Sequence, residues 1–196
     1  MSVDPRTKLL DDVIAYAGEH GLSHASLREI ATGVGTSHRM LIHHFGSKED
    51  VLIAVVDEVE RRQREAMREL AENASDLEGL WPIWQHWCDP RLAPYERLFF
   101  ELYGQALQGR PWAKPMLDRA VHDWIEPIAQ TLEASGADAD PAAVRLTLAV
   151  TRGLLLDLLA TGDREAVDAA MERFVDSVLA DRTTQSSSGS QSRSMS

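Results

Sequence analysis

Residues 26–52 read SLREIATGVGTSHRMLIHHFGSKEDVL, and this segment is the most informative part of the sequence about the architecture. Three helix starts follow one another within it, at Ser26, Ser37 and Ser47. A serine at a helix start caps the helix by accepting a hydrogen bond from an exposed backbone amide, and Glu29 completes a capping box with Ser26. The first two helices have room for about seven residues each. Helices that short form only when packed together, so the spacing predicts a helix-turn-helix.

The segments on both sides of this stretch also carry helical spacing, and strand signals are nearly absent. A first helix is expected to begin at Asp4-Pro5 and to stop at Gly21, with a buried stripe of Leu9, Leu10, Val13, Ile14 and Ala17. Further helices are expected at about 47–72, 80–87, 94–108, 112–134, 141–161 and 164–181. The sequence therefore predicts an all-α protein.

We expect three parts along the chain. Residues 1–50 form an N-terminal three-helix unit with its helix-turn-helix motif at about 26–45, and residues 51–182 form a larger helical domain. Residues 183–196 are rich in serine. A segment of that composition cannot bury a core, so disorder is expected there.

The composition is typical of a soluble globular protein, with 44% hydrophobic residues. The longest apolar run, residues 51–56, is far shorter than the ~18 residues that cross a bilayer. The first residues lack the apolar core of a secretory signal. The single cysteine, Cys88, excludes an intrachain disulfide and a cysteine-based zinc site. We expect a cytoplasmic protein with no membrane partner.

The net charge of −11 argues against a nucleic-acid partner, because phosphates repel an acidic protein. The acidic residues are, however, unevenly spread. Residues 36–48 carry Arg39 and Lys48 as their only formal charges, together with three histidines. This short non-acidic window inside an acidic protein requires an explanation.

The same window lies in a segment that resembles the DNA-binding domain of the TetR family of bacterial transcriptional regulators. The likeness covers about residues 6–55, and it rests on Ser26-Leu27-Arg28-Glu29-Ile30-Ala31, Gly35-Thr36-Ser37, Leu41 and the run from His44 to Leu52. It implies an all-helical homodimer with an N-terminal reading head. It also implies a larger domain that binds a small molecule and dimerises through its last two helices. The chain departs from the pattern at Ile42, where the family usually has a tyrosine that bonds a phosphate, a role open to His43 or His44.

The helix after Ser37 is short enough to lie in a DNA major groove, which is about 12 Å wide. Its first residues would then face base edges, and Arg39 suits guanine through its two-pronged donors. Lys48 begins the next helix, where backbone amides favour a phosphate. No metal site is expected, because the neighbouring histidines do not share a helix face. The expected DNA contacts are Ser26, Arg28, Thr36, Ser37, His38, Arg39, Met40, His43, His44 and Lys48.

All five tryptophans lie between residues 81 and 124. Aromatic side chains at helical spacing are typical of a core, and they also line apolar pockets between bundle helices. The family resemblance favours a pocket for an apolar or aromatic effector. The expected lining is Trp84, Trp87, Phe99, Tyr103, Met116 and Trp124, with Glu101, His122 and Arg152 as polar anchors.

The last two expected helices carry more apolar surface than one core needs. Helix 164–181 has a single apolar stripe, and helix 141–161 is apolar on more than one face. Two such helices from each of two subunits would form a four-helix bundle on a two-fold axis. The expected interface residues are Leu148, Leu155, Leu159, Val167, Met171, Phe174 and Val178.

Together these features predict a ligand-responsive transcriptional regulator, a dimeric repressor that binds a palindromic double-stranded DNA operator and is released by a small molecule. The alternative is a helical small-molecule-binding or scaffold protein whose head no longer binds DNA, which Met40, Ile42 and the acidic charge motivate. Steep salt dependence of DNA affinity would favour the regulator. An enzyme is not expected, because nucleophile elbows, phosphate loops and cofactor fingerprints do not occur. No cofactor is expected either.

Overall fold

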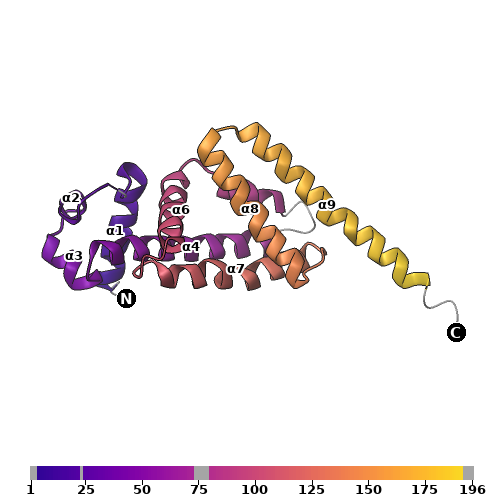
Figure 1. The fold of residues 1–196 in the computed structure, drawn as a ribbon, viewed down its shortest axis with the longest axis horizontal. Helices are drawn as coiled ribbons and strands as arrows, with labels where there is room; N and C mark the ends of the chain where they lie inside the picture. Colours follow the sequence, from indigo (N-terminus) through magenta and orange to yellow (C-terminus); the bar gives the residue numbers. More distant parts are fainter. Residues whose placement is uncertain (1–3, 23, 73–79, 192–196) are drawn as a thin grey trace. The chain divides into compact units, whose positions relative to one another are not determined.

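The structure is a computed structural model that describes residues 4–22, 24–72 and 80–191. Within these residues it consists of nine helices and no strand (Figure 1). The prediction of an all-α fold is therefore confirmed. The helices are α1 (Pro5–His20), α2 (Leu27–Gly33), α3 (His38–Phe45), α4 (Lys48–Glu72), α5 (Leu80–Trp87), α6 (Ala93–Leu107), α7 (Lys114–Ala134), α8 (Pro141–Thr161) and α9 (Arg164–Gln191).

The chain divides into two compact units. Unit 1 comprises residues 1–63 and 89–121, and unit 2 comprises residues 64–88 and 122–196. The long helices α4 and α7 each contribute residues to both units. A functional division of the chain at residues 50 and 51 remains a prediction.

Unit 1 is built around α1, whose start and stop follow the sequence signals. Asp4 caps the helix by accepting a hydrogen bond from the backbone N–H of Thr7 at 3.2 Å, and Gly21 ends it with a positive φ of 71°. The five expected apolar residues of α1 are all buried. They form one core with buried residues of the other unit 1 helices, among them Ile30, Leu41, Val55 and Leu102.

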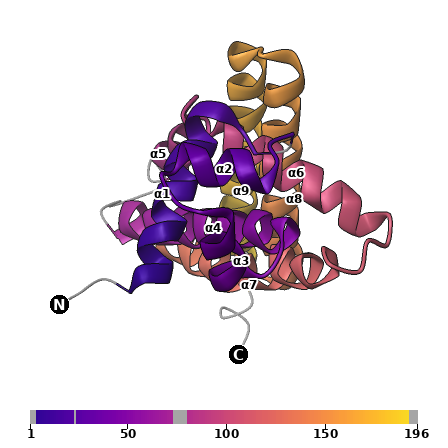
Figure 2. The same ribbon diagram turned by 90° about the vertical axis from the view of Figure 1, so that its left-hand side faces the viewer.

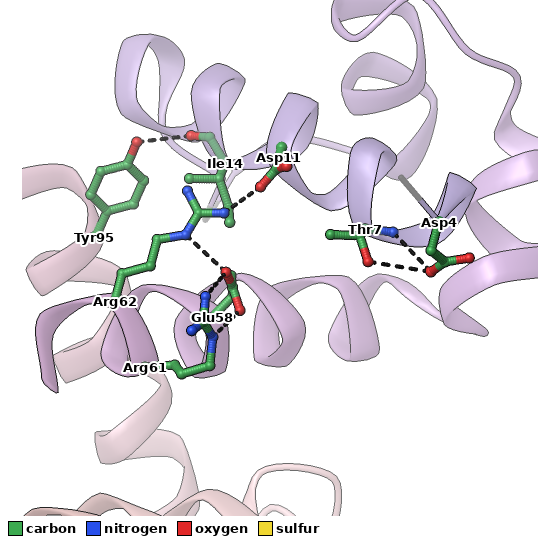
Figure 3. Close-up of polar contacts among 8 residues, drawn as sticks. All are labelled: Asp4, Thr7, Asp11, Ile14, Glu58, Arg61, Arg62 and Tyr95. Carbon is green, nitrogen blue, oxygen red and sulfur yellow. Dashed lines mark hydrogen bonds and ion pairs between the residues drawn. The ribbon is translucent and has the colours of Figure 1, made fainter. Parts of the chain in front are cut away.

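A polar cluster ties α1 to α4 and α6 within unit 1 (Figure 3). Arg62 of α4 bonds both Asp11 of α1 and Glu58 of its own helix, the latter at 2.9 Å. The hydroxyl of Tyr95 on α6 donates to the carbonyl oxygen of Ile14 at 2.9 Å. These contacts hold α1 from two neighbouring helices, and α1 is the helix against which the short helices pack.

Arg61 also bonds Glu58, at 2.7 Å and 2.8 Å. The hydrogen bond from Arg61, together with the nearby charge of Arg62, lowers the pKa of Glu58 to about 2. Glu58 is therefore a carboxylate that the fold keeps charged well into acid.

Unit 2 contains the antiparallel pair α8 and α9, which a short turn joins (Figure 1). Asp140 caps α8 by accepting from the amides of Ala142 and Ala143, and Gly162 ends it in the left-handed conformation. Leu148 and Leu155 of α8 are buried, as are Val167 and Met171 of α9. The pair therefore buries one face within unit 2.

The last helix is longer than the sequence predicted. It was expected to end near residue 181, yet α9 runs to Gln191. The expected disordered tail is thus helical over residues 183–191 in this structure, and the rest of the tail lies outside the described residues. A helix that is already formed gains one hydrogen bond for each residue added, and this segment contains no proline to stop it.

Candidate functional site

The helix-turn-helix is held in shape by caps at both of its helices. The Ser26 hydroxyl accepts from the amide of Glu29 at 3.3 Å, and the Glu29 carboxylate accepts from the amide of Ser26 at 2.7 Å. Ser37 caps α3 in the same way by accepting from the amide of Met40 at 3.2 Å. The expected capping box and second cap are confirmed, and α2 and α3 pack against each other through Ile30 and Leu41.

The start of α4 repeats this device. The Ser47 hydroxyl accepts from the amide of Asp50 at 3.1 Å, and Asp50 accepts from the amide and hydroxyl of Ser47 at 3.0 Å and 2.6 Å. These three hydrogen bonds fix the first turn of α4, where Lys48 is the first helical residue. The cation is thereby anchored next to the end of α3.

One side of α3 is buried and the other faces outward. Leu41 is fully buried, whereas Arg39 and His43 are exposed. The apolar side chains of Met40 and Ile42 are 41% and 43% exposed. The outward face of α3 therefore combines hydrogen-bond donors with two exposed apolar side chains.

Arg6 secures the other end of α3, a contact that sequence reasoning missed. Its Nε donates to the carbonyl oxygen of His44 at 3.3 Å, and its guanidinium lies 5.0 Å from the centre of the Phe45 ring. The two residues of this hydrogen bond are 38 positions apart in the chain, so no local sequence pattern predicts it. It joins the start of α1 to the last turn of α3 and so helps to orient the outward face of α3. Figure 2 shows the ribbon of α1, α2 and α3.

The expected DNA-contacting residues fall into two groups. Thr36, His38, His44 and Lys48 are half-buried, and Ser26, Arg28, Ser37, Arg39, Met40 and His43 are exposed. The hydroxyls of Ser26 and Ser37 are already engaged as caps. Their contribution is therefore to position the helices, while Arg39, Met40 and His43 stand free of the core.

A separate apolar cavity lies within unit 2 and measures about 50 Å³. Its walls come from the ends of α4 and α7 and from α5, α8 and α9. Among the described residues that line it, none carries a formal charge, and its polar side chains are threonines and tryptophans. The lining is Met67, Ile83, Trp84, Trp87, Ile128, Thr131, Leu132, Thr147, Thr151, Met171, Phe174, Val175 and Val178.

The expected ligand-binding residues are only partly brought together. Trp84 and Trp87 line the cavity, and Trp124 lies beside it with its ring 5.7 Å from that of Trp87. Phe99 and Met116 instead pack in the core of unit 1, with Tyr103 against them. Residue spacing cannot tell which of two cores an aromatic residue joins, and a role of these three residues in ligand binding stays a prediction.

The expected polar anchors Glu101, His122 and Arg152 are also absent from the described lining. Thr131, Thr147 and Thr151 supply its hydroxyls instead. Threonines inside helices give no sequence signal that separates a pocket from a core, and for this reason they were missed.

Most of the expected dimer-interface residues face the interior of their own subunit. Leu148, Leu155, Val167 and Met171 are buried, and Phe174 and Val178 line the cavity. Leu159 is half-buried. Four of the seven side chains are thus buried within unit 2 and three are half-buried, and their place at a dimer interface stays a prediction.

The described residues contain no group of three or more His, Cys, Asp or Glu side chains arranged to hold a metal ion. A search of the same part of the chain finds no helix long and apolar enough to span a membrane.

Two family models match the chain. The model of bacterial regulatory proteins of the tetR family matches residues 9–55. The model of the tetracyclin repressor-like C-terminal domain matches residues 96–181. The first match contains the three capped helix starts, and the second runs from within α6 to within α9. No curated protein sequence matches the chain.

Several solved structures share the fold. A transcriptional regulator from Rhodococcus sp. Rha1 is 18% identical, with 91% of this chain and 97% of that chain covered and a TM-score of 0.73. The multidrug binding protein EbrR, solved with proflavin, is 25% identical, with 87% and 99% covered and a TM-score of 0.57. SmeT in complex with triclosan is 19% identical, with 90% of each chain covered and a TM-score of 0.63.

Proposed function

From the premise that this chain belongs to the tetR family of bacterial regulatory proteins, we propose that it is a dimeric repressor that releases a palindromic operator when an apolar small molecule binds. As a member of the family it is a DNA-binding transcriptional regulator and not an enzyme. We propose that the protein acts in the cytoplasm, where its DNA operator lies. The observation that carries the proposal is the outward face of α3, which stands on a capped and tethered helix-turn-helix.

Base reading is assigned to this outward face of α3. Arg39 at its start can donate two hydrogen bonds to the O6 and N7 atoms of guanine. Met40 and Ile42 offer apolar contact to thymine methyl groups, which explains their exposure better than core packing does. An operator half-site that contains a guanine and neighbouring thymines follows from these side chains.

Phosphate contacts are assigned to the flanks of α3. Lys48 is the first residue of α4, where the positive end of the helix dipole adds to its charge. The side chains of His43 on α3 and Arg28 on α2 are exposed. His43 is also the exposed candidate for the phosphate role of the family tyrosine, which is Ile42 here. Because the whole protein is acidic, this local patch has to supply the attraction to DNA.

Dimerisation is assigned to the face of α8 that unit 2 leaves outside. Leu146 and Leu156 are 54% and 50% exposed, and Ala149, Gly153 and Ala160 are exposed between and beyond them. Their spacing of three and four residues places them on one stripe. Small residues along such a stripe allow close approach of a second copy. A dimer would present two copies of α3 to successive major grooves, about 34 Å apart.

The effector site is assigned to the cavity of unit 2. EbrR and SmeT, which share the fold, were solved with proflavin and triclosan, and the apolar cavity here suits a molecule of low polarity. An engineered cavity of about 150 Å³ holds benzene, so a ring-sized molecule needs the walls of this smaller cavity to move. Such a ligand prefers the widened form and shifts the population toward it. Met67 on α4 lines the cavity, and the same helix begins at Lys48, a proposed phosphate contact. One continuous helix therefore contains both a cavity residue and a proposed DNA contact.

Salt titration of DNA binding tests the proposal, using a duplex selected from random sequence. The wild type should lose affinity steeply with salt, and Arg39→Ala should bind that duplex about ten- to hundredfold more weakly at fixed salt. Arg110→Ala is the matched control, since Arg110 is exposed in the loop after α6, and its affinity should be unchanged. If Arg39→Ala bound as well as the control, α3 would not be the reading helix, and the binding-protein alternative would lead.

A further inference from the structure

Trp84 and Trp87 both line the cavity, but their indole nitrogens Nε1 have different surroundings. Nε1 of Trp84 donates to Asp168 Oδ1 at 2.6 Å. Asp168 also accepts from Arg164 Nε at 2.7 Å, and Arg164 donates to the carbonyl oxygen of Cys88 at 3.1 Å. Trp84 is thus fixed by a network between α5 and α9. Nε1 of Trp87 is buried, and the described part of the chain offers it no acceptor.

A buried N–H without an acceptor is costly, by more than the net gain of an ordinary hydrogen bond. The ring of Trp87 is nonetheless held in place. It meets the Trp124 ring edge to face at 5.7 Å, and the guanidinium of Arg64 lies 5.6 Å from the centre of the Trp124 ring. The donor is therefore held in a fixed position by its neighbours.

The other polar side chains of the cavity do not accept a hydrogen bond from Trp87 Nε1. The hydroxyls of Thr131 and Thr147 donate to the carbonyl oxygens of Pro127 and Ala143, each at 2.9 Å within their own helices. Each hydroxyl oxygen keeps a lone pair that can accept a further hydrogen bond, but neither accepts one from Trp87 Nε1. Among the described lining residues, Trp87 is therefore the one that carries a buried donor without an acceptor, and the lining has no formal charge.

We infer that the effector is an uncharged, largely apolar molecule that carries a hydrogen-bond acceptor, such as a carbonyl, ether or ring nitrogen, and that Trp87 Nε1–H donates to it. This inference rests on the proposed function, because it takes the cavity as the effector site. An ionised ligand is disfavoured, since it would lose its hydration without gaining a counter-charge from the lining. A pure hydrocarbon would leave the Trp87 donor unmatched.

Quinoline and naphthalene test the inference as probes, because they share a shape and differ by one ring nitrogen that can accept a hydrogen bond. Their dissociation constants are measured by equilibrium dialysis at pH 7.5 with the full chain and with Trp87→Phe. The variant should weaken quinoline about five- to tenfold more than naphthalene, the value of one neutral hydrogen bond. Trp84→Phe is the control, because Trp84 also lines the cavity but its Nε1 already donates to Asp168. This variant should change the dissociation constants of the two probes by the same factor.

A second measurement uses the wild-type protein, in case Trp87→Phe fails to fold. In ¹⁵N-labelled protein the indole N–H signal of Trp87 should move downfield with quinoline and not with naphthalene. If both probes bind and Trp87→Phe weakens them equally, the cavity stands and the role of Trp87 is overturned. If neither probe binds the wild type, the effector site itself is wrong, and the inference falls with it. DNA binding by α3 is measured separately and is unaffected by either result.

Discussion

Replacing Gly18 of α1 by alanine should destabilise the protein, although alanine favours a helix over glycine by about 1 kcal/mol. A Cβ at position 18 would lie 2.5 Å from the hydroxyl oxygen of Tyr95 and 3.2 Å from its Cζ. The hydroxyl has to retreat by roughly 1 Å to reach an ordinary contact distance. That retreat breaks its 2.9 Å hydrogen bond to the carbonyl oxygen of Ile14, shown in Figure 3.

Three contributions determine how far the free energy of unfolding falls in Gly18→Ala. Crowding of a packed site costs about 1–3 kcal/mol, the lost hydrogen bond about 1 kcal/mol, and the helix preference of alanine returns about 1 kcal/mol. The free energy of unfolding should therefore fall by about 1–3 kcal/mol in Gly18→Ala. Urea unfolding followed by far-UV circular dichroism measures it.

Two further variants isolate the cause. Gly104→Ala makes the same change inside α6, where the added Cβ meets nothing within 4 Å, and it should be neutral or stabilising by up to about 1 kcal/mol. In a Tyr95→Phe background the clashing oxygen and its hydrogen bond are both gone, so Gly18→Ala should cost at least about 2 kcal/mol less than in the wild type. If Gly18→Ala were as stable as Gly104→Ala, the close approach of Tyr95 to α1 would not exist as described.

Two other predictions concern charge and capping. The folded pKa of Glu58, about 2, lies below its unfolded value of about 4.3, so its stabilisation is present above pH 4.3 and is lost as the pH falls toward 2. Glu58→Gln should lower the free energy of unfolding by about 1–2 kcal/mol at pH 7, a value discounted for solvent screening because the Arg61 and Arg62 side chains are more than 40% exposed. In urea unfolding, the difference between the variant and the wild type should be smaller at pH 2.5 than at pH 7. An equal difference at the two pH values would contradict this. Ser37→Ala should cost about 1 kcal/mol through the lost cap on the amide of Met40, whereas Ser37→Asn should keep the thermal midpoint near that of the wild type.

The reading head was predictable from sequence because its signals are local. Asp4, Ser26 and Ser37 each act on amides within three residues, and the stripe of α1 repeats at helical spacing. Such features depend on chain geometry alone, so caps, helix starts and the buried face of α1 match the structure. The end of α9 was not predictable in this way, because serine neither stops a helix nor extends it strongly.

The cavity was not predictable because its lining depends on which helices pack together. Phe99 and Trp84 look alike in the sequence, yet one joins the core of unit 1 and the other lines the cavity of unit 2. Phe174 was predicted at a dimer interface for the same reason, since an apolar stripe does not name its partner. The long-range bond from Arg6 to the carbonyl of His44 also has no local signal.

The central claim is that α3 reads a palindromic DNA site, and selection of bound sequences from random duplex DNA tests it most directly. The complex should be isolated at low salt and sized by light scattering. We predict enrichment of a palindrome on a protein dimer, with half-sites one helical turn of about 34 Å, or a multiple of it, apart, and with a guanine and thymines in each half. Recovery of random sequence at low salt would contradict the account.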